Sequence, residues 1–249
     1  MKKNDAIASF FFRVYRKVFM NFFERVITLF STEKYMELLL EGFKNTFIIS
    51  MAATVLGLIL GTIVALINLA PNTPIMWFPK ALSKVYITVI RGTPMALQLF
   101  IMIFVVFAIR GFPPVVTAII AFGINSGAYV AENIRAGILS VDIGQTEAGR
   151  ALGLNNGTTM GKIVIPQAIK NVIPAIGNEI IALIKETSIV GMISITDLTQ
   201  SAKIIGAGNN MASYLIPMSV AALFYLAIVY ALSLFIKIIE RRLRASDKR

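Results

Sequence analysis

The feature that most constrains the fold of this chain is an uncharged apolar run of 25 residues at 45–69. As a helix, this run would be roughly 37 Å long, enough to cross the ~30 Å hydrocarbon core of a bilayer with some tilt. Four further apolar stretches follow, at 85–109, 112–131, 172–196 and 204–236. Because backbone groups in hydrocarbon must be satisfied within the protein, we predict that these stretches are helices. The expected fold is therefore an all-α integral membrane protein with about five transmembrane helices.

The overall composition excludes several other classes of protein. Hydrophobic residues make up 57% of the 249 residues and charged residues only 15%, whereas soluble domains carry roughly 25% charged residues. A soluble helical protein of this length could not bury so much apolar surface. The chain contains no cysteine and no histidine, which excludes disulfides, thiolate or imidazole metal ligands, and Ser–His or Cys–His nucleophile pairs. We expect neither a metal site nor a catalytic centre.

Basic residues predict how the chain is oriented in the membrane. The segment 132–171 and the tail at 237–249 are rich in lysine and arginine, whereas the opposite connections hold little more than Arg110 and Lys203. By the positive-inside rule, the central loop and the carboxyl terminus face the cytoplasm. The net charge of +11 would suggest nucleic acid in a soluble protein, but here it fits cytoplasmic anchoring and anionic lipid. We therefore expect membrane lipid as a partner and no nucleic acid.

The amino-terminal region conflicts with this orientation. Residues 1–44 carry eight lysines or arginines and five acids, yet five spans would place them outside. Charged side chains there recur at helical spacing opposite phenylalanines, which predicts an amphipathic surface helix. The charged face holds Arg13, Arg16, Lys17 and Glu24, and the apolar face Phe11, Phe12, Phe19, Phe22 and Phe23. A sixth span here is the alternative, with both termini inside. The predicted domains are an interfacial segment at 1–36, a transmembrane domain at 37–240 and a basic tail at 241–249.

The central loop contains a predicted short helix at 142–154. Asp142 and Gln145 have the spacing of a capping box, and the run Asn155-Asn156-Gly157 that follows is a strong helix breaker. One set of side chains is small enough to let another backbone approach closely: Ala148, Gly149, Ala151 and Gly153. Glu147 and Arg150 offer charged contacts. The loop is either a docking element or a plain amphipathic connector.

The residues of this loop resemble a family signature. The run Glu147-Ala148-Gly149, then Gly153, then Ile163-Val164-Ile165-Pro166 is similar to the EAA loop of binding-protein-dependent ABC transporter permeases. Gly149 stands where a second alanine is usual, and Ile165 where leucine is commoner. Outside the loop, Arg91-Gly92-Thr93-Pro94 followed by Gln98 looks like the R-G-T-P-x-x-x-Q of polar amino-acid permeases of the histidine/glutamine/arginine type. The resemblance covers residues 37–240.

The resemblance implies a mechanical role for the loop at about 140–166. Its helix would be a coupling helix seated in a groove of a cytoplasmic ABC ATPase dimer, through Glu147, Ala148, Gly149, Arg150 and Gly153. The chain contains no G-x-x-x-x-G-K-[ST], so it would be a non-catalytic subunit without a cofactor, and ATP and Mg would lie on the ATPase. A second permease subunit, identical or paralogous, and an extracytoplasmic amino-acid-binding protein would complete an importer of polar amino acids, cationic ones included, in a bacterial cell membrane.

Four polar side chains within the predicted spans are candidates for the substrate pathway: Glu179, Arg91, Gln98 and Asn125. A carboxylate at membrane depth usually faces a cavity or a partner, so Glu179 could bind a cationic group of the substrate or pair with Lys185 or Arg91. Arg91 could meet a substrate carboxylate or anchor its helix at the membrane interface. Gln98 and Asn125 could contact the ligand, although interhelical hydrogen bonds are the commoner use of such residues.

Two G-x-x-x-G patterns fall within predicted spans, at Gly57 and Gly61 and at Gly123 and Gly127. Such patterns let helices approach closely, and we expect them to pack within the subunit.

Two other functional classes fit the sequence less well. A secondary transporter or channel would need ion-handling groups along several spans, and a membrane-embedded enzyme would need paired carboxylates at one depth.

Overall fold

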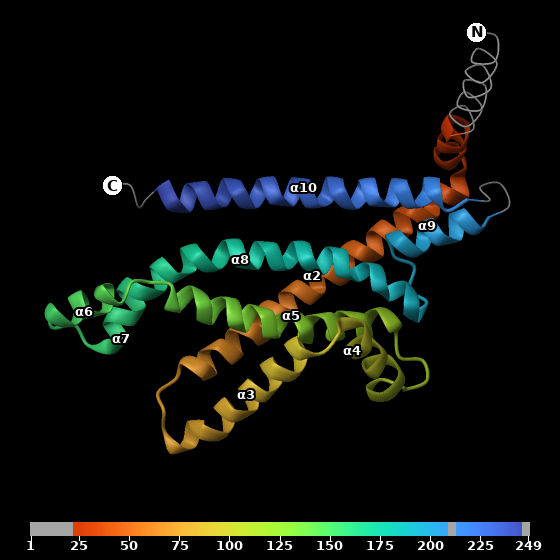
Figure 1. Cartoon of the computed structure of the whole chain (residues 1–249). Coiled ribbons are helices and arrows are strands. Elements are labelled where there is room, and N and C mark those ends of the chain that lie inside the picture. Colours follow the sequence, from red (N-terminus) through yellow and green to blue (C-terminus); the bar gives the residue numbers. More distant parts are fainter. Residues whose placement is uncertain (1–21, 209–212, 246–249) are drawn as a thin grey trace, which may run out of the picture.

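The computed structural model describes residues 22–208 and 213–245, and every regular element in these ranges is helical (Figure 1). Three helices in these ranges are long and apolar enough to cross a membrane: α2 (Glu33–Leu69), α5 (Pro114–Leu139) and the Leu215–Leu243 part of α10 (Leu215–Ala245). They contain the predicted span 45–69 and most of the predicted spans 112–131 and 204–236. The predicted all-α membrane fold is confirmed.

The predicted span at 85–109 is broken in the structure. Helix α3 (Pro74–Gly92) ends before Thr93-Pro94, and α4 (Met95–Ile101) then continues into the π-helical segment η1 (Met102–Val106). A proline disfavours the helical conformation of the residue before it, and Thr93 is accordingly extended, with φ −122° and ψ 147°. The chain bends by 111° between Pro74–Gly92 and Met95–Val106, the geometry of a broken span or a re-entrant loop.

The predicted span at 172–196 is helical over only part of its length. Helix α8 (Ile165–Glu186) is followed by the 3-10 segment η3 (Thr187–Ile193) and then by α9 (Leu198–Ala207). Helix α8 is not among the helices apolar enough to cross a membrane by hydropathy, because Lys170, Glu179, Lys185 and Glu186 interrupt it. The number of membrane crossings therefore stays a prediction.

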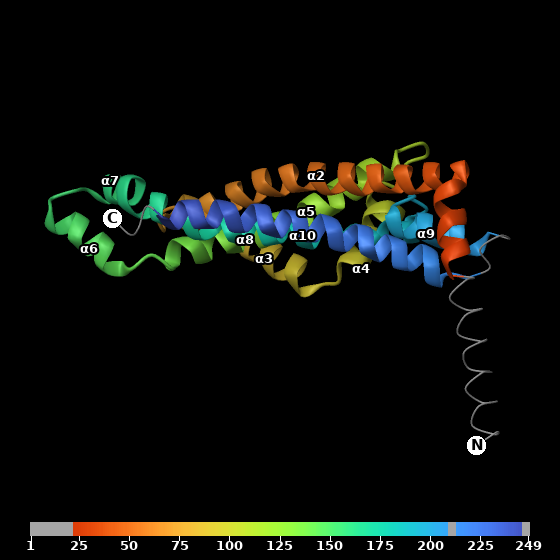
Figure 2. The same ribbon diagram turned by 90° about the horizontal axis from the view of Figure 1, so that it is seen from above.

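The helices run between two opposite ends of an elongated bundle (Figures 1 and 2). One end carries α6 (Ile143–Ala151), α7 (Asn156–Thr159) and the carboxyl-terminal end of α10. The other end carries α9 and the helix at 22–31. The central loop and the end of α10 thus share one side, as the distribution of basic residues requires.

The amino-terminal part of the chain is only partly described. The predicted amphipathic helix falls mostly on residues 1–21, which lie outside the described residues. Within the helix at 22–31, Leu29 is fully buried against α9 and α10, whereas Phe23 is half exposed. Helix α2 begins at Glu33, and the domain boundaries at 36 and 240 remain predictions.

A buried carboxylate organises the end that carries α9. Asp197 is completely buried, and its side chain accepts hydrogen bonds from the backbone N–H groups of Thr199 (2.9 Å) and Gln200 (3.0 Å). It is the N-cap residue of α9, a position that favours aspartate. The hydroxyl of Tyr225 on α10 also donates to Asp197, at 3.2 Å. This one side chain therefore ties α9 to α10.

The two G-x-x-x-G patterns face each other between α2 and α5. A Cβ added at Gly57 would lie 2.8 Å from the side chain of Ser126, and one at Gly61 would lie 2.6 Å from Val130. A Cβ added at Gly123 would lie 2.5 Å from the side chain of Leu56, and one at Gly127 would lie 3.1 Å from Cβ of Leu60. The four glycines, Gly57, Gly61, Gly123 and Gly127, therefore let α2 and α5 approach within one subunit.

Candidate functional site

The loop helix α6 has well-formed ends. The Asp142 carboxylate accepts a hydrogen bond from the Gly144 N–H at 2.7 Å and caps the first turn. At the other end, Gly153 has a φ of +77°, its N–H donates to the Arg150 carbonyl at 2.9 Å, and the Leu154 N–H donates to the Gly149 carbonyl at 3.1 Å. These two bonds form a Schellman motif. The helix predicted at 142–154 exists but ends at Ala151, earlier than expected.

The capping box forms only in part, because Gln145 bonds elsewhere. Its side-chain oxygen accepts a hydrogen bond from Nε2 of Gln167 on α8, at 3.2 Å. This contact fastens α6 to the helix that follows the loop.

The small residues of α6 have different roles. Gly149 is buried, and a Cβ there would lie 2.7 Å from Thr159 Cγ2 and 3.2 Å from Ile163 Cδ1. Its small size therefore lets the loop fold onto itself, whereas we expected it to face a partner. Around Gly153 a Cβ would meet nothing within 4 Å, so glycine is needed there for its positive φ rather than for close packing.

The outward face of α6 is both charged and apolar. Glu147, Ala148 and Arg150 are exposed, and Arg150 also donates to Asn156 Oδ1 at 3.2 Å. Ile143 and Leu152 are 71% and 79% exposed. These two side chains were not predicted from the sequence to take part in docking, although apolar residues at both ends of a water-facing helix are a signal of it.

Gln98 and Asn125 lie together beside the break between α3 and α4. The Asn125 amide donates to Gln98 Oε1 at 2.9 Å, while Gln98 Nε2 donates to the Ile90 carbonyl (2.8 Å) and to Thr93 Oγ1 (2.7 Å). Asn125 is buried. The Gln98 amide thus replaces helix hydrogen bonds that the Thr93-Pro94 break removes, and Asn125 joins α5 to this arrangement.

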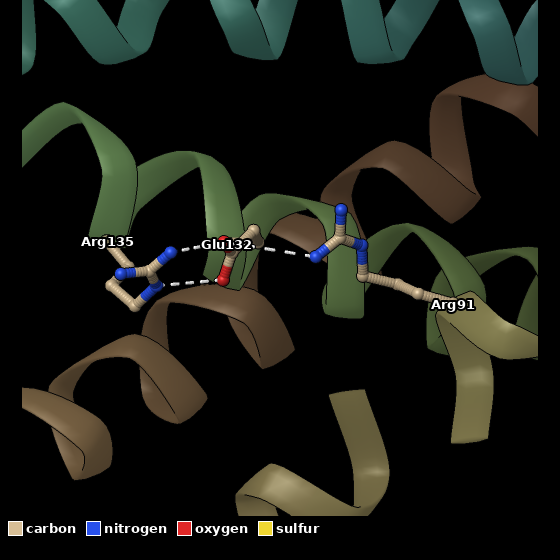
Figure 3. Close-up of polar contacts among 3 residues, drawn as sticks. All are labelled: Arg91, Glu132 and Arg135. Carbon is tan, nitrogen blue, oxygen red and sulfur yellow. Dashed lines mark hydrogen bonds and ion pairs between the residues drawn. The ribbon is translucent and has the colours of Figure 1, made fainter. Parts of the chain in front are cut away.

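Arg91 lies close to a carboxylate that a second arginine also uses (Figure 3). Its Nη1 is 3.9 Å from Glu132 Oε1, and its guanidinium lies over the ring of Tyr129, 5.3 Å from the ring centre. Glu132 is bound more closely by Arg135, whose Nε donates to Oε2 at 2.9 Å and whose Nη2 donates to Oε1. No site role was predicted for Glu132 from the sequence, although a charged pair three residues apart on an apolar helix could have indicated one.

Glu179 on α8 contacts neither of the partners considered for it. Its carboxyl group lies close enough to the Ser126 side chain of α5 to interact with it. Ser126 is buried, so this contact lies between α5 and α8. The structure therefore brings Gln98 together with Asn125, and places Arg91 and Glu179 in two separate contacts.

A bundle of apolar helices long enough to span a membrane, with polar contacts between the helices and a capped helix projecting from one end, fits a membrane transport subunit. Comparison with known proteins specifies the family. Residues 57–245 match the model of the "binding-protein-dependent transport system inner membrane component" family. The chain belongs to this family, whose members are non-catalytic permease subunits.

Curated relatives cover most of the chain. The arginine transport system permease protein ArtQ of Bacillus subtilis is 39% identical over 211 residues, which are 84% of this chain and 94% of ArtQ. The glutamine transport system permease protein GlnP of Escherichia coli K12 is 37% identical, over 83% of this chain and 93% of GlnP.

Solved structures share the fold. The crystal structure of an amino acid ABC transporter with histidines contains a chain that is 37% identical, with a TM-score of 0.77 over 86% of this chain and 98% of that one. An inward-facing MetNI methionine ABC transporter matches with a TM-score of 0.69 at 20% identity, which supports the fold alone.

Proposed function

We propose that this chain is a permease subunit of an ATP-driven importer of polar amino acids, cationic ones included. The observation that carries the proposal is the family match together with relatives named for arginine, glutamine and cystine transport at 37–39% identity. Helices α2, α5 and α10 form the membrane-embedded part, and the chain itself performs no hydrolysis.

The partners follow from the family. A cytoplasmic ABC ATPase dimer holds ATP and Mg and receives α6, and an extracytoplasmic binding protein delivers the amino acid. A second permease subunit, either an identical copy or a paralogue, forms the other half of the pathway. This arrangement is supported by the exposed face of α6, where Ile143 and Leu152 flank Glu147. Exposed apolar side chains together with a charged contact are the composition of a docking site.

The proposed location is a bacterial cell membrane, with the carboxyl terminus in the cytoplasm. Support comes from α6 and the end of α10, which lie at the same end of the bundle (Figure 1). Cysteine labelling at position 150 in intact cells tests it: Arg150→Cys is expected to be protected from an impermeant reagent, and labelling from outside would reverse the orientation.

The coupling role is tested by reversing a charge on α6. In vesicles that contain the permease, its ATPase and the binding protein, we expect Glu147→Arg to abolish amino-acid-stimulated ATP hydrolysis and uptake, while the amount of inserted protein is unchanged. Lys203→Glu, an exposed residue on α9 at the other end of the bundle, is the matched control and is expected to retain both activities. Normal coupled transport by Glu147→Arg would refute the docking role.

The pathway residues Glu179, Gln98 and Asn125 stay candidates, and the charge of Glu179 makes it the one that can be tested for selectivity. We expect Glu179→Gln to reduce uptake of arginine more than uptake of glutamine. Equal losses for both amino acids would remove the charge-pairing role.

A further inference from the structure

The cluster of Arg91, Glu132 and Arg135 contains two positive charges and only one carboxylate. Glu132 lies seven residues before the end of α5 at Leu139, which is about 10 Å from that end at 1.5 Å per residue. Two guanidinium groups share this single carboxylate, so the cluster carries one uncompensated positive charge. At membrane depth, such a charge must face water, a ligand or another polar group rather than lipid.

The shared carboxylate is divided unequally between the two arginines. Arg135 binds both oxygens of Glu132 in a bidentate manner, the strong geometry for an arginine and a carboxylate. Arg91 approaches only to 3.9 Å, which is too long for a hydrogen bond. Within the described part of the chain, the guanidinium group of Arg91 makes no hydrogen bond and no other ion pair, and the side chain is 40% exposed.

The remaining contact of Arg91 leaves its donors available. The guanidinium lies over the ring of Tyr129, an arrangement that holds the face of the planar group while its N–H edges stay free. No acid occurs in the sequence between Glu41 and Glu132, so neither most of α2 nor any part of α3 or α4 offers a second carboxylate. An anion that pairs with Arg91 therefore has to come from outside these helices.

We propose that Arg91 binds the α-carboxylate of the transported amino acid. The carboxylate of Glu132 competes with the substrate for Arg91, and its bidentate pair with Arg135 limits this competition. This inference rests on the proposed function, since it names the group of the substrate that the pathway recognises. In the substrate-free state, Glu132 partly neutralises Arg91. When a free carboxylate arrives, it forms the bidentate pair with Arg91 that Glu132 does not form.

The loose contact suits transport. A transport site must bind well enough to admit its substrate and weakly enough to release it. Glu132 is close enough to return to Arg91 when the amino acid leaves, so the arginine is never left without a neighbouring negative charge.

The test compares amino acids with their α-amides, which lack the carboxylate. The purified complex of permease and ATPase, without the binding protein, is placed in lipid nanodiscs. Isothermal titration then measures the Kd for L-arginine and L-glutamine and for L-argininamide and L-glutaminamide. We expect the wild type to bind each acid more tightly than its amide. Arg91→Gln should weaken binding of the acids about tenfold or more and leave the amides unchanged. Arg91→Lys, which keeps the charge but not the bidentate geometry, should lie between.

The two neighbours should act in opposite directions. Glu132→Gln removes the competitor, so binding of the acids should tighten several-fold. Arg135→Gln releases Glu132 toward Arg91, so binding of the acids should weaken. Neither change should affect the amides, whereas a purely structural role would alter acids and amides alike. Arg110→Gln, outside the cluster, is the control and should change nothing.

Two kinds of failure are distinguishable. If Glu132→Gln weakens acid binding or leaves it unchanged, or if Arg91→Gln affects acids and amides equally, Arg91 is not the carboxylate-binding residue. The proposed function as an importer subunit is not affected by that result. If the wild-type complex binds neither amino acid and the complete importer takes up neither, the proposed function itself fails.

Discussion

The contact between α2 and α5 makes Gly61→Val the most informative single substitution for the fold. A Cβ at position 61 would lie 2.6 Å from Cβ and Cγ1 of Val130 and 2.7 Å from the carbonyl oxygen of Gly127. Carbon atoms in ordinary contact are about 3.5–4.0 Å apart, so α2 and α5 would have to separate by about 1 Å. Because one obstructing atom is a backbone oxygen and another is a Cβ, no side-chain rotation relieves the clash.

We expect Gly61→Val to lower the free energy of unfolding by about 2–3 kcal/mol, at the upper end of the usual cost of overpacking a core. Valine is only slightly better than glycine in a helix, so helix propensity offsets little of this loss. The measurement is reversible unfolding of the purified protein by SDS in mixed micelles, followed by far-UV circular dichroism.

The control for this experiment is Gly92→Val. A Cβ at Gly92 would meet nothing within 4 Å, so a change below about 0.5 kcal/mol is expected. Adding Val130→Ala to Gly61→Val should recover only part of the loss, because it removes Cγ1 but keeps Cβ. If Gly61→Val and Gly92→Val unfold at the same SDS fraction, the α2–α5 contact is not the one described above.

Three further substitutions test other contacts. Gly153→Ala places a Cβ on a residue with a φ of +77°, which costs about 1–2 kcal/mol of conformational energy. We expect faster hydrogen exchange of the backbone amides of α6, with a smaller increase for Gly153→Asn; unchanged exchange would refute the strain. Asp197→Ala removes the acceptor for three donors and should lower the free energy of unfolding in SDS by about 2 kcal/mol. The exposed helix cap Asp142→Ala should lower it by only about 0.5–1 kcal/mol, and equal losses would contradict the role of Asp197 as a buried acceptor. Gln98 and Asn125 share a hydrogen bond, which either Gln98→Ala or Asn125→Ala removes. The double variant should therefore lose less stability than the sum of the two single losses; strict additivity would show that the bond contributes nothing.

Long uncharged runs and helix-capping residues could be interpreted from the sequence alone. The run at 45–69 lies in α2, and Asp142 does begin the loop helix. These features depend on local properties: the cost of unpaired backbone groups in lipid, and the ability of an aspartate side chain to bond the first turn. The end of α6 was predicted less well, because the positive φ of Gly153 was not considered.

The partners of charged side chains could not be predicted, because they depend on which helices become neighbours. For Glu179 the alternatives were a cationic group of the substrate or a pair with Lys185 or Arg91, yet within the described chain its side chain lies against Ser126 on α5. Arg91 instead meets Glu132, 41 positions away in the chain. Likewise, Gly149 was assigned to a partner contact, but Thr159 folds back over it. Small size in a sequence does not reveal which surface uses it.

The way α6 is fastened to the start of α8 has a mechanical consequence. Gln145 is hydrogen-bonded to Gln167, and Gly149 is covered by Thr159 and Ile163. These two contacts hold α6 against the segment that follows it and make the loop rigid. A displacement of the outward face of α6 is therefore passed on to the first turns of α8, because the loop between them bends little. In the coupling role proposed for α6, loosening this loop would weaken the transmission of movement from the ATPase to α8.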